Sequence, residues 1–148
     1  MKKKAISPNY FNIFFILMIG SHFLMPIRQI VHLPYNSLGV IIIFSGLSLN
    51  ILAIITLRNN NTTVKFNEDP TSLVIRGPYQ ISRNPVYLGG LMLMFGLAIL
   101  LGSLIAFIFP ILLFLVLNKF YISVEEEKLE RIFGHAYINY KNRVRRWI

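Results

Sequence analysis

Four long apolar runs divide the 148-residue chain, and they are separated by short turns and one long polar segment. The runs predict membrane-spanning helices at about 9–27, 37–57, 86–101 and 104–122. The second run is the clearest, because its 21 residues carry no charge and would extend about 30 Å as a helix, the thickness of a bilayer's hydrocarbon core. The last two spans come from one apolar run of 36 residues, Val86 to Tyr121, which would be about 54 Å long as a single helix. Because Gly102-Ser103 divides this run, we expect a tight helical hairpin there.

Small and polar residues in the second predicted span indicate helix packing. Gly39, Ser45, Gly46 and Ser48 are small enough for another helix to approach closely. Asn50 is the only strongly polar residue of this span, and we expect it to hydrogen-bond to another helix.

Composition favours an integral membrane protein with a single domain, residues 1–148. The chain is 55% hydrophobic and 14% charged, whereas a soluble domain is about 45–50% apolar and about 25% charged. It has no cysteine, which excludes disulfides, thiolate nucleophiles and cysteine-ligated metals. We expect no metal site, since the three histidines have no metal-ligand spacing: His22, His32 and His135.

The distribution of positive charge predicts the orientation in the membrane. Of the 15 lysines and arginines, 14 lie in the N-terminal leader, in the 58–85 segment or from residue 119 onward. Four spans would place these three regions on one side, and the positive-inside rule makes that side the cytoplasm. The net charge is +9. We therefore interpret the positive residues as flanking membrane spans, and not as a nucleic-acid-binding surface. We expect an all-α protein of the cell inner membrane with both termini and its site in the cytoplasm, and the sequence leaves its oligomeric state open.

One polar stretch, residues 75–90, stands at a predicted membrane boundary. Gly77-Pro78 is a turn signal, and Pro85 suits the first turn of the third span. Two cations and two tyrosines share this stretch: Arg76, Arg83, Tyr79 and Tyr87. Irregular backbone at membrane depth requires protein groups or a ligand to satisfy it, so we expect a site here.

The segment that follows the fourth span predicts an amphipathic helix. It begins near Glu125, and Gly134 stands at its expected C-terminal cap. Tyr137 and Tyr140 then share one helical face, before a basic tail at 141–146.

Two sequence blocks resemble a family of membrane methyltransferases that includes isoprenylcysteine carboxyl methyltransferases and phospholipid N-methyltransferases. The first block is LVIRGPYQISRNPVYLG (residues 73–89), and the second contains Glu125-Glu126, Phe133-Gly134 and the two tyrosines after them. An apolar hairpin lies between the blocks, as in that family. The resemblance covers residues 71–148, about half of the chain.

The resemblance implies S-adenosylmethionine as methyl donor and a lipid or lipidated acceptor. Glu125 corresponds to an active-site carboxylate, and Arg83 suits the carboxylate of the donor, so these two are the predicted catalytic residues. The residues expected to bind the cofactor are Thr71, Ser72, Leu73, Val74, Tyr79, Arg83, Asn84, Pro85, Val86, Tyr87 and Glu126.

Two departures from the family pattern keep alternatives open. Asn84 stands where the family has histidine, and Tyr121 stands where many isoprenylcysteine enzymes have arginine. The acceptor is therefore left open among an isoprenylcysteine carboxylate, a phospholipid amine and similar groups. A second interpretation is an NADPH-dependent membrane reductase of the sterol reductase type, and a third is a catalytically degenerate membrane scaffold.

Overall fold

The computed structural model describes residues 10–25, 28–63 and 68–148, and these residues form helices and loops with no strand. The α-helices are α1 (Tyr10–Leu24), α2 (Leu38–Asn59), α3 (Pro85–Leu101), α4 (Ile108–Val116), α5 (Ser123–Phe133) and α6 (His135–Arg143). Shorter helical segments are η1 (Tyr35–Ser37), η2 (Gly77–Gln80), η3 (Leu104–Phe107) and the π-helix η4 (Leu117–Ile122). The all-α prediction is confirmed.

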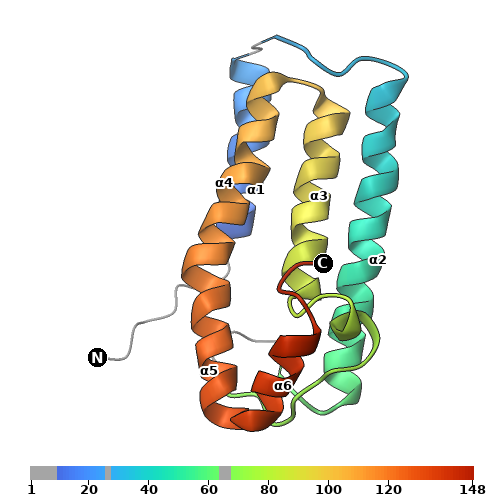
Figure 1. Cartoon of the computed structure of the whole chain (residues 1–148). Coiled ribbons are helices and arrows are strands. Elements are labelled where there is room, and N and C mark those ends of the chain that lie inside the picture. The colour runs from blue at the N-terminus through green and yellow to red at the C-terminus, as the bar shows by residue number, and fades with distance from the viewer. Residues whose placement is uncertain (1–9, 26–27, 64–67) are drawn as a thin grey trace.

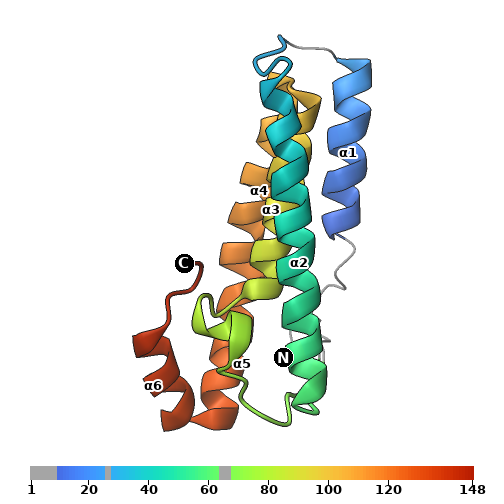
Figure 2. The same ribbon diagram turned by 90° about the vertical axis from the view of Figure 1, so that its right-hand side faces the viewer.

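Four helices, α1 to α4, form the long body of the molecule, and α5 and α6 lie together at one end of it (Figures 1 and 2). The main packing is between α2 and α3, while α4 contacts both α1 and α3. The described helices long and apolar enough to cross a membrane are Tyr35–Asn59 and Leu104–Phe133. The other two apolar helices, α1 and α3, are shorter.

The helix boundaries agree with the predicted hairpin. α3 ends at Leu101, and helix resumes at Leu104. Gly102 between them has a φ of +71°, a conformation that glycine adopts without a steric cost. Its carbonyl accepts hydrogen bonds from the backbone N–H groups of Ile30 and Val31, at 2.8 and 3.1 Å. The predicted fourth span and the amphipathic helix after it form one continuous helix from Leu104 to Phe133. Residues 9, 26 and 27 of the predicted first span lie outside the described residues.

Glycines bring α2 and α3 into backbone contact. Gly39 faces Gly96, and Gly46 faces Gly89, so each helix contributes two glycines seven residues apart to an antiparallel pair. The prediction of a close helix approach is confirmed for Gly39 and Gly46, whereas Ser45 and Ser48 are exposed.

The expected interhelical hydrogen bond of Asn50 is also present, because its side-chain amide donates to the carbonyl of Val86 at 3.1 Å. This contact fixes the first turn of α3 against α2.

A second, smaller core holds the polar segment before α3 against α6. Its buried residues come from α2, the loop, η2 and α6: Ala53, Val74, Tyr79, Tyr137 and Tyr140. The Tyr140 hydroxyl donates to the backbone carbonyl of Tyr79 at 2.6 Å. Burial raises the pKa of Tyr140, so this donor keeps its proton at neutral pH.

The predicted turn at Gly77-Pro78 begins η2, and Gly77 has a φ of +58°. The loop and the C-terminal helices therefore form one wall beside the start of α3.

Candidate functional site

A buried ion pair joins the polar stretch before α3 to α5. Glu126 is 4% exposed, and its Oε1 lies 2.9 Å from Nη2 of Arg83. Pro85 at the first position of α3 ends the preceding loop and so places Arg83 at the base of this helix. Glu126 lies in the first turn of α5, which directly follows the π-helix. The two blocks of the sequence resemblance thus meet in the fold.

Arg83 has two nitrogen atoms without a partner. Its side chain is 9% exposed, and neither Nε nor Nη1 has a hydrogen-bond partner among the described residues. A buried donor without a partner costs about 1–3 kcal/mol, and more when the group is charged. The two unsatisfied donors of this buried guanidinium are therefore suited to an anionic acceptor such as a carboxylate.

A second arginine, Arg146 of the C-terminal tail, holds the same carboxylate. Its Nη2 lies 2.6 Å from Oε2 of Glu126, and its Nε lies 3.2 Å from Oε1. Its Nη1 donates to Oδ1 of Asn118 in the π-helix at 3.0 Å. Glu126 therefore has both oxygens occupied by arginines, and the three ionised groups have a net charge of +1.

Hydrogen bonds fix the tail against the loop before α3. The carbonyl of Arg146 accepts from Oγ of Ser82 at 3.1 Å and from Nδ2 of Asn84 at 3.2 Å. The backbone N–H of Arg83 donates to the carbonyl of Arg145 at 3.1 Å. Asn84, which stands where the family has histidine, thus has an amide hydrogen bond that helps hold the tail.

The other glutamate of the pair is held by a tyrosine of α3. The hydroxyl of Tyr87 donates to Oε2 of Glu125 at 2.9 Å. Tyr10 and Tyr79 lie within electrostatic range of the same carboxylate, and the rings of Tyr10 and Tyr121 have centroids 4.2 Å apart. Glu125 is half-buried among these phenols. Its carboxylate can therefore pair with a cation or accept a proton.

The remaining predicted cofactor residues fall into two groups. Thr71 and Ser72 are tied to the end of α2, because their hydroxyls donate to the carbonyls of Asn61 and Asn60 at 2.6 and 2.8 Å. The others line the second core or the start of α3: Leu73, Val74, Tyr79, Pro85 and Val86. The structure thus brings Arg83 to Glu126 and Tyr87 to Glu125. Thr71 and Ser72 instead bond to the two residues that directly follow α2.

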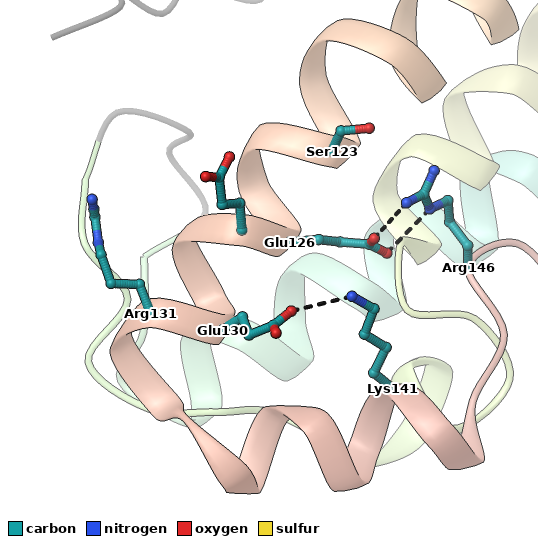
Figure 3. A pocket seen from close by; sticks show the side chains of 7 residues that line it. Ser123, Glu126, Glu130, Arg131, Lys141 and Arg146 are labelled. Atoms are coloured by element: carbon teal, nitrogen blue, oxygen red, sulfur yellow. Dashed lines mark hydrogen bonds and ion pairs between the residues drawn. The ribbon is translucent and has the colours of Figure 1, made fainter. Parts of the chain in front are cut away.

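A pocket of about 380 Å³ opens between α5, α6 and the tail (Figure 3). Two charged pairs lie in its wall, Glu126 with Arg146 and Glu130 with Lys141. Its lining residues are Ser123, Glu126, Glu127, Glu130, Arg131, Lys141 and Arg146. Glu126 and Arg146 therefore form part of the wall of this pocket.

Sequence reasoning missed Arg146, Asn118 and Tyr10 as parts of this site. Arg146 is one of several basic residues of the tail, and no local signal distinguishes it from its neighbours. Asn118 gave a weak signal, since it is a polar residue at the end of an apolar run. The fold alone shows that Arg146 contacts Glu126, that Asn118 contacts Arg146 and that Tyr10 lies near Glu125.

Comparison with known proteins shows which family and which solved structure this chain is similar to. The model of the phospholipid methyltransferase family matches residues 35–136. An uncharacterized protein of Haemophilus influenzae is 40% identical over 63 residues, which are 43% of this chain and 100% of that protein. Among solved structures, the eukaryotic intramembrane Ras methyltransferase, isoprenylcysteine carboxyl methyltransferase, superimposes with a TM-score of 0.67.

That enzyme is 23% identical, and the match covers 96% of this chain but 52% of the enzyme's chain. The chain therefore spans about half the length of that enzyme, and at this identity the match concerns the fold. The family match covers more than two thirds of the chain and includes the first sequence block and the second block as far as Gly134. The chain belongs to the phospholipid methyltransferase family.

Proposed function

We propose that this protein transfers a methyl group from S-adenosylmethionine to a lipid-like acceptor at the cytoplasmic face of the cell inner membrane. Family membership supports methyl transfer at a membrane, and the family neighbours are methyltransferases rather than NADPH-dependent reductases. In this proposal α1, α2, α3 and the helix from Leu104 all span the bilayer, with both termini on the cytoplasmic side.

The observation that carries the proposal is that two donors of the Arg83 guanidinium are unsatisfied. Its buried Nε and Nη1 have no partner among the described residues, and Arg83, Arg146 and Glu126 together have a net charge of +1. The methionine part of the donor has a carboxylate that would accept from one of these nitrogens. Arg83 fits this group because a guanidinium keeps its positive charge and donates charge-assisted hydrogen bonds to a carboxylate.

The other side chains of the site have separate roles in this proposal. S-adenosylmethionine supplies a methyl group on a positively charged sulfonium, and the faces of Tyr79 and Tyr87 suit such a cation. Glu125, held by the Tyr87 hydroxyl, is placed to receive a proton that the acceptor loses. Glu126 acts through the two arginines that occupy its oxygens. Binding and orientation then provide most of the rate enhancement, with no covalent enzyme intermediate.

A binding titration tests the proposal. The purified protein in detergent is titrated with S-adenosylmethionine, S-adenosylhomocysteine and NADPH by calorimetry. We expect micromolar binding of the first two and none of NADPH. Binding of NADPH alone would move the protein to the reductases, and no binding of any of the three would favour a scaffold.

Replacement of Arg83 tests the residue that carries the proposal. Loss of a charge-assisted hydrogen bond, worth about 1.5–3 kcal/mol, should weaken S-adenosylhomocysteine binding at least about tenfold in Arg83→Ala. Glu126 would still be paired with Arg146, so the variant should fold. Arg76→Ala is the matched control, because Arg76 lies in the same loop and is exposed. Equal affinity of the two variants would remove Arg83 from the site.

A further inference from the structure

Two arginines share one buried carboxylate, but they do so unequally. Arg146 contacts both oxygens of Glu126 with two nitrogens, at 2.6 and 3.2 Å. Arg83 contacts only Oε1, through Nη2 at 2.9 Å. The forked pairing that a guanidinium prefers with a carboxylate is thus made by the tail residue and not by Arg83.

This unequal sharing determines the state of Arg83. With Arg146 present, the cluster has two positive charges and one negative charge, and Arg83 keeps two unpartnered nitrogens. Without Arg146, Oε2 of Glu126 would be vacant, and Arg83 could form the fork itself. The cluster would then be neutral, and Arg83 would have fewer free donors for another anion.

We propose that Arg146 is a positioning residue that occupies Glu126 and so keeps Arg83 available for the carboxylate of the methyl donor. The inference rests on the proposed function, because it assigns that carboxylate to Arg83. Arg146 itself does not touch the donor in this account; it acts through Glu126.

The structure holds Arg146 in place from several directions. Its Nη1 donates to Oδ1 of Asn118, and the indole N–H of Trp147 reaches the same oxygen at 3.4 Å. The Trp147 ring lies 5.1 Å from that of Phe114. The backbone carbonyl of Arg146 is fixed by Ser82 and Asn84. The guanidinium therefore has a defined position over Glu126, as Figure 3 shows.

The test must separate this role from simple anchoring of the tail. Two ligands do so: S-adenosylhomocysteine, which has the amino-acid carboxylate, and methylthioadenosine, which has the same nucleoside and a thioether but lacks the carboxylate. In Arg146→Ala we expect S-adenosylhomocysteine affinity to fall about tenfold or more, with methylthioadenosine affinity unchanged. A purely structural role would weaken both ligands equally, and that result would overturn the proposal.

Arg145→Ala is the matched control. It removes the same charge one residue earlier, from an exposed side chain, while the backbone bond to Arg83 remains possible. We expect its affinity for S-adenosylhomocysteine to stay within about twofold of the wild type. An equal loss in both variants would mean that general positive charge, not the pairing of Glu126, supports binding.

A double variant gives a second, independent readout. Glu126→Gln combined with Arg146→Ala removes one negative and one positive charge, so the cluster returns to a net charge of +1 and Arg83 has no carboxylate to pair with. S-adenosylhomocysteine affinity should recover at least partly relative to Arg146→Ala alone. A further loss in the double variant would contradict the inference.

The outcomes distinguish this inference from the proposed function. If the wild type binds S-adenosylhomocysteine and Arg146→Ala binds it with the same affinity, the inference is overturned and the proposed function stands. No wild-type binding would overturn both. Thermal unfolding in the same detergent reports whether each variant is folded; if Arg146→Ala is not, Arg146→Lys replaces it. Arg146→Lys keeps the positive charge but cannot form the forked pairing with Glu126. We expect its affinity for S-adenosylhomocysteine to lie between that of the wild type and that of Arg83→Ala. Wild-type affinity for both ligands would contradict the inference.

Discussion

The contact between α2 and α3 gives a sharp prediction, because two neighbouring glycines of α3 differ in what surrounds them. A Cβ added at Gly89 would lie 2.7 Å from the carbonyl oxygen of Gly46 and 3.0 Å from Cβ of Asn50. A Cβ added at Gly90 would meet nothing nearer than an edge carbon of Phe11 at 3.5 Å. Gly89→Ala should therefore push the helices apart, whereas Gly90→Ala should not.

The expected magnitude follows from these distances. Ordinary van der Waals contact begins at 3.4 Å, so the alanine at residue 89 requires a movement of about 0.7 Å away from the backbone of α2. Overpacking of this kind costs about 1–3 kcal/mol, while alanine gains up to about 1 kcal/mol over glycine in a helix. Because only the second effect operates at Gly90, the two variants should differ by about 1–3 kcal/mol, with Gly89→Ala the less stable.

Thermal unfolding of both variants in one detergent measures the difference. A shift of about 2–4 °C per kcal/mol is typical for chains of 150–250 residues, so Gly89→Ala should unfold at a temperature several degrees below that of Gly90→Ala. Methyl transfer should also fall in Gly89→Ala, because Asn50 fixes the first turn of α3 through the carbonyl of Val86. Equal unfolding temperatures would refute the close packing of these helices.

Three further substitutions test the site and its supports. Glu125→Gln should lower methyl transfer at least about a hundredfold, the usual scale for losing a proton acceptor, while calorimetry shows S-adenosylhomocysteine still bound; unchanged turnover would exclude Glu125 as that acceptor. Tyr140→Phe should lower the free energy of unfolding by about 1–3 kcal/mol, because the buried carbonyl of Tyr79 loses its partner, and denaturant titration would detect this loss. Asn84→Ala should loosen the tail, so that trypsin cleaves within residues 143–146 faster than in the wild type, and equal cleavage rates would show that the Asn84 amide does not hold the tail.

Much of the fold could be predicted from the sequence because the signals were local. Length and lack of charge marked the apolar helices, and Gly102 marked the hairpin turn, where a positive φ is needed. Small residues predicted that another helix would approach α2. The sequence could not reveal which glycine of α3 faces each glycine of α2, because that register depends on the tertiary packing of the two helices.

The site was predictable only as far as its two sequence blocks extend. Arg83, Tyr87 and the glutamate pair could be placed near one another, since the hairpin returns the chain to the same end of the bundle. The pairing of Arg146 with Glu126 could not be foreseen, because the tail has four basic residues within 141–146 and nothing local singles out one of them. The amide of Asn84 likewise gained its role from a backbone carbonyl more than sixty residues away.

The most direct test of the proposed function is transfer of a labelled methyl group. Membranes containing the wild-type protein or Arg83→Ala are incubated with S-adenosylmethionine labelled with tritium in its methyl group, and the lipids are then extracted with organic solvent. The proposed function predicts labelled lipid with the wild type and background counts with Arg83→Ala. Lipid that gains no label from the wild type, or the same label from both proteins, would contradict it.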